Sequence, residues 1–254
     1  MKSIFLSVCT LCAFGLFAQN QNPESAKMKR DVTEIWEPEV KVITPSDNNP
    51  GPSSDAIVLF DGSSESLLRN WVNEKGEAPG WKVADKCVTV INGAGKIITK
   101  SKFEDFQLHI EWRTPAEPNP ENKSQTRGNS GIIMQENYEL QVLDSYNNRT
   151  YSNGQAGSIY KLHSPLVNVS KKPGEWQTYD VVYTAPRFKS DSTLITPARV
   201  TVLQNGILVQ NNVELLRPTE YIGMPGNKMH SPGSLELQDH INPVSYRNIW
   251  IRKL

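Results

Sequence analysis

Three short segments of the chain alternate apolar and polar residues, and their polar positions carry groups suited to acid–base chemistry and hydrogen bonding. In residues 138–143 the alternation places Tyr138, Leu140 and Val142 on one side of a strand. Glu139 and Gln141 then point to the other side. A carboxyl and an amide are therefore held together on one face.

The same pattern occurs in residues 106–113 and 235–240. Their polar positions are Gln107, His109, Glu111 and Arg113 in the first segment, and Glu236, Gln238 and His240 in the second. If the three strands share one sheet, they cover a single face with carboxylates, amides and imidazoles. Such a face suits a sugar-binding groove, because an amide offers a sugar hydroxyl both a donor and an acceptor. The alternative is the ordinary solvated face of an antiparallel sheet.

The elements that position these residues are predicted to be strands. Short apolar runs separated by turn residues occur about every ten residues, and no amphipathic helix of ten or more residues is found, so the pattern indicates a β-sandwich or barrel. Residues 199–204 and 207–210 flank Asn205-Gly206 and predict a hairpin with a type I′ turn. A last strand is predicted over residues 246–251, near the end of the chain.

The composition is that of a soluble globular protein. The 254 residues include 17 Pro and 16 Gly, with 21% charged and 37% hydrophobic residues. Residues 1–18 resemble a secretory signal peptide, with Lys2 before an apolar run and Ala18 at its end, which predicts a periplasmic or secreted protein. Residues 19–54 are predicted to be an extended leader, and residues 55–254 a single all-β domain.

Charge and cysteine content exclude several classes of protein. Removal of the signal takes away Lys2 alone among the charged residues, so the 27 basic groups become 26 against 27 acidic groups. A protein so close to neutrality is not expected to capture nucleic acid or an anionic membrane. The apolar run of the signal is too short to span a membrane, so no membrane insertion is expected. Cys87 would be the one remaining cysteine, which leaves no internal disulfide and no structural zinc motif.

With these residues in view, the chain from about residue 57 to its end resembles the bacterial family of 3-keto-disaccharide hydrolases. The landmarks that carry the resemblance follow one another in order along the chain: residues 59–62 (LFDG), 106–112 (FQLHIEW), 128–132 (GNSGI), 138–144 (YELQVLD), 172–179 (KPGEWQTY), 237–240 (LQDH) and 243–249 (PVSYRNI). Each landmark alone is weak evidence for the family, but their order along the chain makes the whole set specific to it.

The resemblance implies a concanavalin A-like jelly roll, in which two antiparallel sheets pack together and one of them carries a carbohydrate site. It also implies cleavage of glycosides whose glucose unit has been oxidised to a ketone at C3. The sequence departs from the family pattern at Glu236, where a small residue is more common, and at Ile241-Asn242, which replaces a more common glycine. These departures concern the choice of substrate more than the fold.

The implied substrate explains why acids, amides and imidazoles would suffice. A ketone at C3 acidifies the hydrogen on C2, so a base can remove it and the resulting enolate can expel the oxygen on C1; water then adds to the unsaturated sugar. The hypothesis from the sequence is that His240 or Glu111 is the base, with the other residue and Asp144 assisting. A divalent metal held by Glu111, Asp144 and His240 could polarise the ketone, although their spacing carries no metal signature. Alternatively, Asp144 caps a turn beside Ser145.

Other residues are predicted to bind the sugar. Gln141, Glu139 and Gln238 are expected to contact its hydroxyl groups from the polar face. Loop residues expected at the rim of the groove are Arg127, Asn129, Tyr160 and Lys161. For Asn129 the alternative is that residues 128–131 only build a turn.

Two other functions remain open from the sequence. One is a conventional glycosidase of the laminarinase type, in which two carboxylates flank the scissile bond; Gln141 stands where that class would need an acid. The other is a non-catalytic glycan-binding module, for which aromatic residues should outnumber acids on the polar face.

Overall fold

The computed structural model describes residues 30–48 and 50–254. The chain divides into two units, residues 1–42 and residues 43–254. The described part of the first unit contains one short 3-10 helix, η2 (Arg30–Thr33). The predicted signal peptide, residues 1–18, and residues 19–29 of the leader lie outside the described residues. Residues 43–54, assigned to the leader from the sequence, belong to the second unit, where the amide of Asn248 donates to the carbonyl of Pro50.

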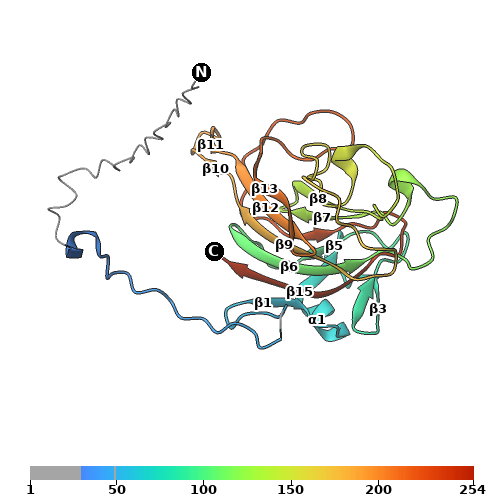
Figure 1. Cartoon of the computed structure of the whole chain (residues 1–254), viewed down its shortest axis with the longest axis horizontal. Coiled ribbons are helices and arrows are strands. Elements are labelled where there is room, and N and C mark those ends of the chain that lie inside the picture. The colour runs from blue at the N-terminus through green and yellow to red at the C-terminus, as the bar shows by residue number, and fades with distance from the viewer. Residues whose placement is uncertain (1–29, 49) are drawn as a thin grey trace, which may run out of the picture. The chain divides into compact units, whose positions relative to one another are not determined.

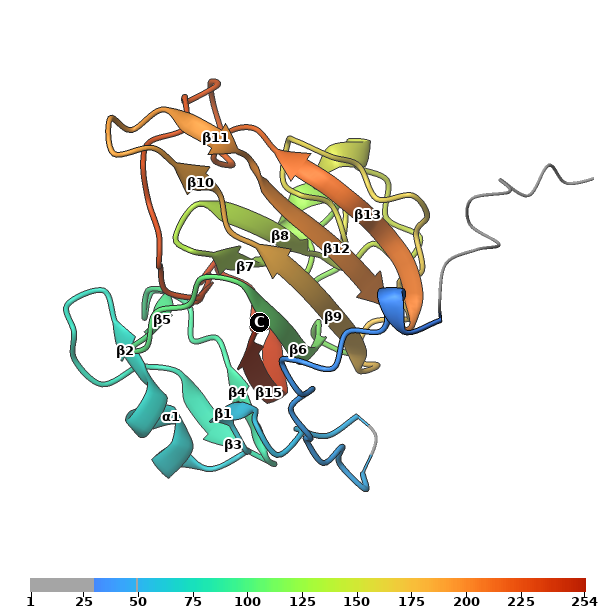
Figure 2. The same cartoon turned by 90° about the vertical axis from the view of Figure 1, so that its left-hand side faces the viewer.

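The second unit is built on two antiparallel sheets (Figure 1). The larger sheet has eight strands, seven of them in the order β13-β12-β9-β6-β15-β4-β3, while β1 also pairs with β15. Figure 2 shows β13, β12, β9 and β6 side by side. The strands of the larger sheet are β1 (Ile57–Phe60), β3 (Lys82–Ala84), β4 (Cys87–Thr89), β6 (Phe106–Arg113), β9 (Gln177–Thr184), β12 (Ala198–Gln204), β13 (Ile207–Leu215) and β15 (Ser245–Lys253).

The smaller sheet has five strands in the order β2-β5-β14-β7-β8. Its strands are β2 (Trp71–Asn73), β5 (Ile97–Thr99), β7 (Ser130–Met134), β8 (Tyr138–Val142) and β14 (Glu236–Leu237). A separate ribbon pairs β10 (Arg187–Phe188) with β11 (Leu194–Thr196). Short 3-10 helices η3 (Ser124–Thr126) and η4 (Ser152–Gly154) lie in the loops that follow β6 and β8.

The core lies between the two sheets. In the larger sheet, the apolar side chains of β6 are at most 1% exposed. In the smaller sheet, the apolar side chains of β8 are fully buried. The Tyr179 hydroxyl on β9 crosses this core and donates to the backbone carbonyl of Gln141 on β8, at 2.7 Å. The predicted all-β jelly-roll sandwich is therefore confirmed, and the alternation of apolar residues is the physical reason for it.

Local predictions are largely confirmed as well. β12 and β13 form the expected hairpin, and Asn205 and Gly206 both adopt the positive φ that a type I′ turn requires (54° and 78°). β15 pairs with β6 and β4, so the end of the chain lies within the sheet. The sequence did not predict the seven-residue helix α1 (Ser64–Asn70), whose N-terminus is capped by the hydroxyl of Ser63.

The expectation that the three polar segments share one sheet is wrong for one of them. Residues 106–113 form β6 of the eight-stranded sheet, whereas residues 138–142 and 236–237 belong to the five-stranded sheet. Both sheets turn their apolar side to the core, so the polar side of β6 faces away from the polar side of β8. Alternation determines which residues share a face of a strand, but it does not determine which sheet the strand joins.

Two smaller expectations concern membranes and cysteine. Among the described residues, no helix is long and apolar enough to cross a membrane. Cys87 is a free thiol and is buried.

Candidate active site

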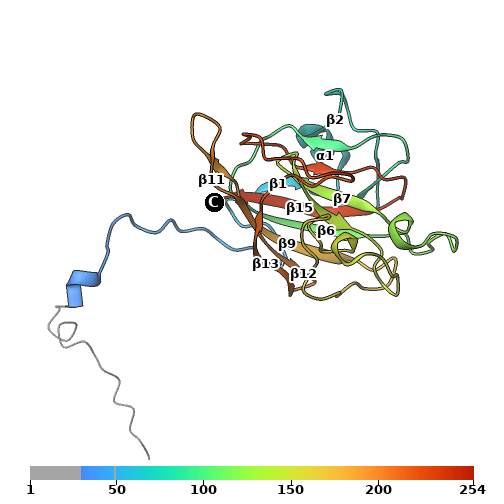
Figure 3. The same cartoon turned by 90° about the horizontal axis from the view of Figure 1, so that it is seen from above.

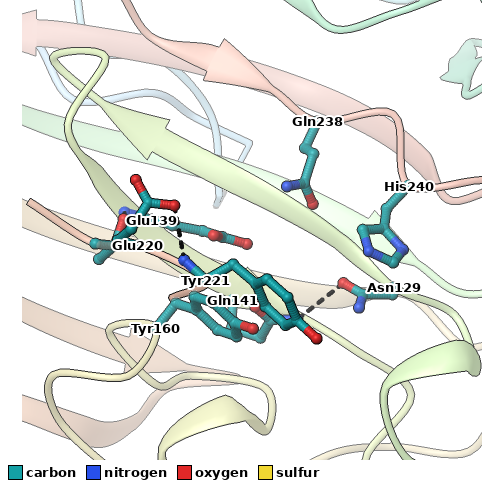
Figure 4. A pocket seen from close by; sticks show the side chains of 9 residues that line it. Asn129, Glu139, Gln141, Tyr160, Glu220, Tyr221, Gln238 and His240 are labelled. Atoms are coloured by element: carbon teal, nitrogen blue, oxygen red, sulfur yellow. Dashed lines mark hydrogen bonds between the residues drawn. The ribbon is translucent and has the colours of Figure 1, made fainter. Parts of the chain in front are cut away.

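A polar pocket of about 240 Å³ lies on the outward face of the five-stranded sheet (Figure 4). Side chains from β8, the turn after β14 and three loops surround it. The lining residues are Asn129, Glu139, Gln141, Tyr160, Thr219, Glu220, Tyr221, Gln238 and His240. The polar positions predicted on β8 and around residues 238–240 therefore do converge. Glu139 and Glu220 lie towards one end of the pocket and His240 towards the other, with Gln141 and Gln238 between them.

Glu139 is the one carboxyl group of the pocket that the fold leaves both partly buried and unpaired. It projects outward from β8, and its carboxylate has no hydrogen-bond or ion-pair partner among the described residues. Burial raises the pKa of Glu139 to about 7, because no neighbouring cation offsets the loss of hydration. A carboxylate that titrates near neutral pH can accept a proton from a weakly acidic carbon far better than an ordinary surface glutamate.

Gly131 on the neighbouring strand β7 gives Glu139 its position. A Cβ at residue 131 would come within 2.5 Å of Oε1 of Glu139 and within 2.9 Å of its Cγ and Cδ. The side chain of Glu139 therefore lies flat against the backbone of Gly131. This close approach is possible because glycine has no side chain.

We expect Gly131→Ala to lower kcat by about tenfold to a hundredfold, because displacing a reacting group by about 1 Å has an effect of that order. The melting temperature should change little, since the crowded atoms are the far end of a flexible side chain. Gly226→Ala is the matched control, because a Cβ there meets nothing within 4 Å and its φ is not positive. Equal activity of the two variants in a steady-state assay would show that the position of Glu139 does not matter.

Gln141 is held in one orientation by its neighbours. Its Nε2 donates to Oδ1 of Asn129 at 2.9 Å, and Nδ2 of Asn129 donates in turn to the carbonyl of Gln125 at 2.8 Å. These bonds leave Oε1 of Gln141 buried without a partner among the described residues. A buried acceptor of this kind requires a hydrogen-bond donor, which a sugar hydroxyl would supply. Asn129 is therefore more than a turn residue, because it both lines the pocket and orients Gln141.

Gln238 enters the pocket from a backbone that is fixed on both sides. Its carbonyl accepts a hydrogen bond from the hydroxyl of Ser130 at 2.6 Å, and that hydroxyl accepts one from Tyr246 at 2.7 Å. Its N–H donates to the carbonyl of Gly131. The side-chain amide of Gln238 has no partner among the described residues, and its Oε1 is buried. Gln238 therefore presents an unused donor and an unused acceptor to a ligand.

His240 lies on a turn that is fixed at both ends. Asp239 accepts hydrogen bonds from the backbone N–H groups of Gly93 and Gly95, at 2.9 and 3.1 Å. On the other side, Oδ1 of Asn242 accepts from the N–H of Gly128 at 2.9 Å. The imidazole itself is exposed and makes no hydrogen bond within the described residues. Its backbone is therefore rigid while its ring nitrogens remain available to a ligand.

An aromatic cluster forms the outer wall of the pocket. The hydroxyls of Tyr151 and Tyr160 are 2.9 Å apart, and the ammonium of Lys161 lies 4.5 Å from the ring centre of Tyr221. Lys161 also donates to the carbonyl of Tyr221. Tyr160 lines the pocket as predicted, whereas Lys161 contacts Tyr221 and does not itself line the pocket.

The sequence did not predict Thr219, Glu220 and Tyr221. They lie in the proline-containing loop after β13, and the Thr219 hydroxyl accepts from the backbone N–H of Glu139 at 3.0 Å. This contact attaches the loop to β8 beside the pocket. The available signal was the length of the loop, because long loops without secondary structure in compact domains are commonly functional.

Glu111 does not line this pocket. It lies on the outward side of β6, where its carboxylate accepts hydrogen bonds from Arg247 at 2.6 Å and Asn248 at 2.9 Å. Burial alone would raise its pKa, but the hydrogen bonds that the carboxylate accepts outweigh burial and lower the pKa to about 2. His109 is held beside it, with Nδ1 2.7 Å from Asp180. Burial lowers the pKa of His109, yet its hydrogen bond to Asp180 and the carboxylate of Glu111, 3.7 Å from Nε2, raise it to about 8. The cluster is a structural ion-pair network.

We expect Glu111→Gln to leave turnover within about twofold of the wild type and to lower the free energy of unfolding by about 2 kcal/mol, the range for charge-assisted hydrogen bonds. Chemical denaturation and steady-state kinetics on the same preparation measure both effects. A large loss of kcat without loss of stability would instead show that Glu111 takes part in the reaction.

Asp144 and Arg127 also serve the fold. β8 ends at Val142, and the carboxylate of Asp144 pairs with the guanidinium of Arg127 at 2.8 Å. Its Oδ1 accepts from the N–H of Tyr146 at 3.1 Å, which caps the following turn as the alternative from the sequence proposed. Neither residue lines the pocket.

The predicted metal ligands Glu111, Asp144 and His240 are not brought together. Glu111 belongs to the larger sheet, Asp144 is occupied by Arg127, and His240 lines the pocket. Among residues 30–48 and 50–254, no three side chains of His, Cys, Asp or Glu gather in a group that could hold a metal ion. The predicted ligand set does not fit a metal.

The antiparallel sandwich and its polar pocket are those of a carbohydrate-active β-sandwich enzyme. Residues 55–252 match the model of the 3-keto-alpha-glucoside-1,2-lyase-like domain, and the chain belongs to this family. A 3-keto-disaccharide hydrolase of Bacteroides thetaiotaomicron is 24% identical over the full length of both chains.

Solved structures from Parabacteroides distasonis share the fold. One, described as a candidate glycosyl hydrolase, is 50% identical and superposes with a TM-score of 0.84, covering 90% of this chain and 98% of the other. A second with the same description is 21% identical, has a TM-score of 0.56 and covers 79% of this chain and 94% of the other; it supports the fold alone.

Proposed function

We propose that this protein cleaves 3-keto-glucosides by elimination across C1 and C2 followed by hydration, which gives net hydrolysis. The observation that carries the proposal is the unpaired carboxyl of Glu139, with its pKa of about 7, in the same pocket as the free imidazole of His240 and the free amide of Gln238. The family and the relative named a 3-keto-disaccharide hydrolase support a ketone-bearing sugar as the substrate.

In the first step, Glu139 is the base. The C3 ketone makes the C2 hydrogen acidic, and the ionised carboxylate of Glu139 takes that proton. The electron pair of the C2–H bond moves onto the ketone oxygen as an enolate. An amide N–H of Gln238 would donate to this oxygen, and a donor placed before the charge develops stabilises it without reorganisation.

In the second step, the enolate expels the substituent on C1. The electron pair returns to form the C1–C2 double bond, the C1–oxygen bond breaks, and His240 in its protonated form donates a proton to the departing oxygen. Water then adds across the double bond, with its oxygen on C1 and a proton on C2. The products are 3-keto-glucose and the free alcohol, so the atoms balance as a hydrolysis.

The remaining polar residues hold the sugar. Oε1 of Gln141 is free to accept a hydroxyl proton, because Nε2 is already bound to Asn129. This arrangement explains why the pocket contains so many amides. They orient the ring and do not compete with Glu139 for protons.

The test uses a pair of substrates that differ at one carbon. The mature protein is incubated with 4-nitrophenyl α-glucoside and with its 3-keto derivative, and release of nitrophenol is followed. The proposal predicts release from the keto form alone, and a rate several-fold lower when C2 carries deuterium, since the C2–H bond breaks in the first step.

Other results of this assay would indicate one of the two alternative functions, a conventional glycosidase or a glycan-binding module. Comparable cleavage of the unoxidised glucoside, without an isotope effect at C2, would indicate a conventional glycosidase. That mechanism needs two carboxylates across the scissile bond, and Asp144 is not available for it. Binding of both sugars without turnover would indicate a glycan-binding module.

A further inference from the structure

A second cavity adjoins the first and shares one residue with it. It has a volume of about 500 Å³, against about 240 Å³ for the first, and His240 lines both. Its walls come from the loop between β6 and β7 and from residues 240–243. Figure 3 shows this green loop extending beyond the end of β7. The two cavities therefore meet at the residue that protonates the leaving group in the proposed reaction.

The linings of the two cavities differ in chemistry. The first is lined by carboxyl, amide, hydroxyl and imidazole groups. The second combines the apolar side chains of Pro115, Pro118, Ile241 and Pro243 with polar side chains from Glu117, Asn119, Asn122, Thr126, His240 and Asn242. Three prolines and an isoleucine offer no side-chain donors to a ring of hydroxyls. They favour a group with an apolar face.

Ile241 is the most unusual residue of this wall. It is 67% exposed, and its backbone has a φ of 71°, a left-handed conformation that β-branched residues rarely adopt. Glycine would satisfy the backbone without strain. The N–H of Ile241 donates to Oδ1 of Asp239 at 3.0 Å, so the anchored turn that holds His240 also holds Ile241 in this conformation. An exposed apolar side chain is thereby fixed beside the catalytic imidazole.

We propose that the second cavity is the leaving-group subsite, that it takes an aromatic or otherwise apolar aglycone, and that Ile241 sets this preference. The proposal rests on the proposed function for the direction in which the bond breaks. A glucose unit in the polar cavity points its C1 oxygen towards His240, and the group attached to that oxygen continues into the second cavity. The glycoside thus spans both cavities, with its scissile bond at their junction.

The test measures binding, so it does not depend on turnover. Dissociation constants of phenyl α-glucoside and methyl α-glucoside, both unoxidised, are measured by isothermal titration calorimetry. In the wild type the phenyl glucoside should bind about tenfold more tightly, the discrimination expected when an apolar pocket gains a filling group. Ile241→Gly should reduce this ratio to about twofold and leave the dissociation constant of the methyl glucoside unchanged.

Ile241→Gly is suited to this binding test because glycine tolerates the backbone conformation at residue 241, so the turn should keep its structure. Ile207→Gly is the control, since Ile207 is also half exposed but lines neither cavity. Equal affinity of the two glucosides in the wild type, or a tenfold ratio that persists in Ile241→Gly, would overturn the proposal. Failure of the proposed function has a different signature, in which 3-keto substrates are not cleaved while the binding ratio and its loss in Ile241→Gly are still observed.

Discussion

Replacing Glu139 by glutamine is expected to lower kcat on a 3-keto-glucoside by about a thousandfold, within the range for loss of a general base. The amide has the shape of the carboxyl but cannot accept the C2 proton. Because the carboxylate of Glu139 has no partner among the described residues, no contact is lost, and the melting temperature should stay the same or rise. A strongly impaired but fully stable variant is the result that a purely structural role would not produce.

The pH dependence of the wild type tests the same role. With the 4-nitrophenyl 3-keto-glucoside, whose leaving group needs no proton from His240, Glu139 must be ionised to act, and its pKa of about 7 means that kcat/KM should fall about tenfold per pH unit below pH 7 and level off above it. Glu220→Gln is the matched control, since Glu220 lines the same pocket but is exposed. It should keep the pH profile and most of the activity. A Glu139→Gln variant that retained turnover and this profile would remove Glu139 from the mechanism.

His240→Ala is expected to have an effect that depends on the leaving group. With methyl 3-keto-α-glucoside, whose alkoxide leaves poorly without a proton, kcat should fall by about a hundredfold to a thousandfold. With the 4-nitrophenyl analogue the loss should be less than about tenfold, because nitrophenolate leaves without protonation. The ratio of the two rates therefore reports the acid role of His240 directly.

A matched histidine replacement controls for loss of an imidazole. His230 lies outside the pocket, with its Nδ1 2.7 Å from the carbonyl of Lys228. His230→Ala should leave the ratio of the two rates unchanged. An equal loss on both substrates in His240→Ala would assign His240 to binding or to proton removal at C2 instead of leaving-group protonation.

Several features of the site could be predicted from the sequence. The alternation in residues 138–142 placed Glu139 and Gln141 on one outward face, and the pattern around residues 238–240 placed Gln238 and His240 near a common surface. The Asn205-Gly206 turn and the last strand were likewise predicted, whereas the jelly roll was implied by the family resemblance. These features depend on local geometry, since the side-chain period of a strand and the positive φ of a tight turn act within a few residues.

The role of Glu111 could not be decided locally. Its alternation resembles that of Glu139, yet β6 pairs with β9 and β15, while β8 pairs with β7. Strand pairing joins residues far apart in the chain, so two identical patterns can end on opposite sides of a sandwich. Arg247 then neutralises Glu111 and Asn248 donates a hydrogen bond to it, whereas Glu139 has no cationic partner among the described residues.

The sequence by itself determined the family, the all-β sandwich and the residue types available for chemistry, because these follow from short-range periodicity and from ordered motifs. Only the tertiary structure decided which carboxyl group of the pocket has no partner among the described residues, that Thr219 to Tyr221 line this pocket, and that a second cavity meets it at His240. The physical reason is that burial, and with it the pKa of Glu139, depends on atoms contributed by distant segments of the chain.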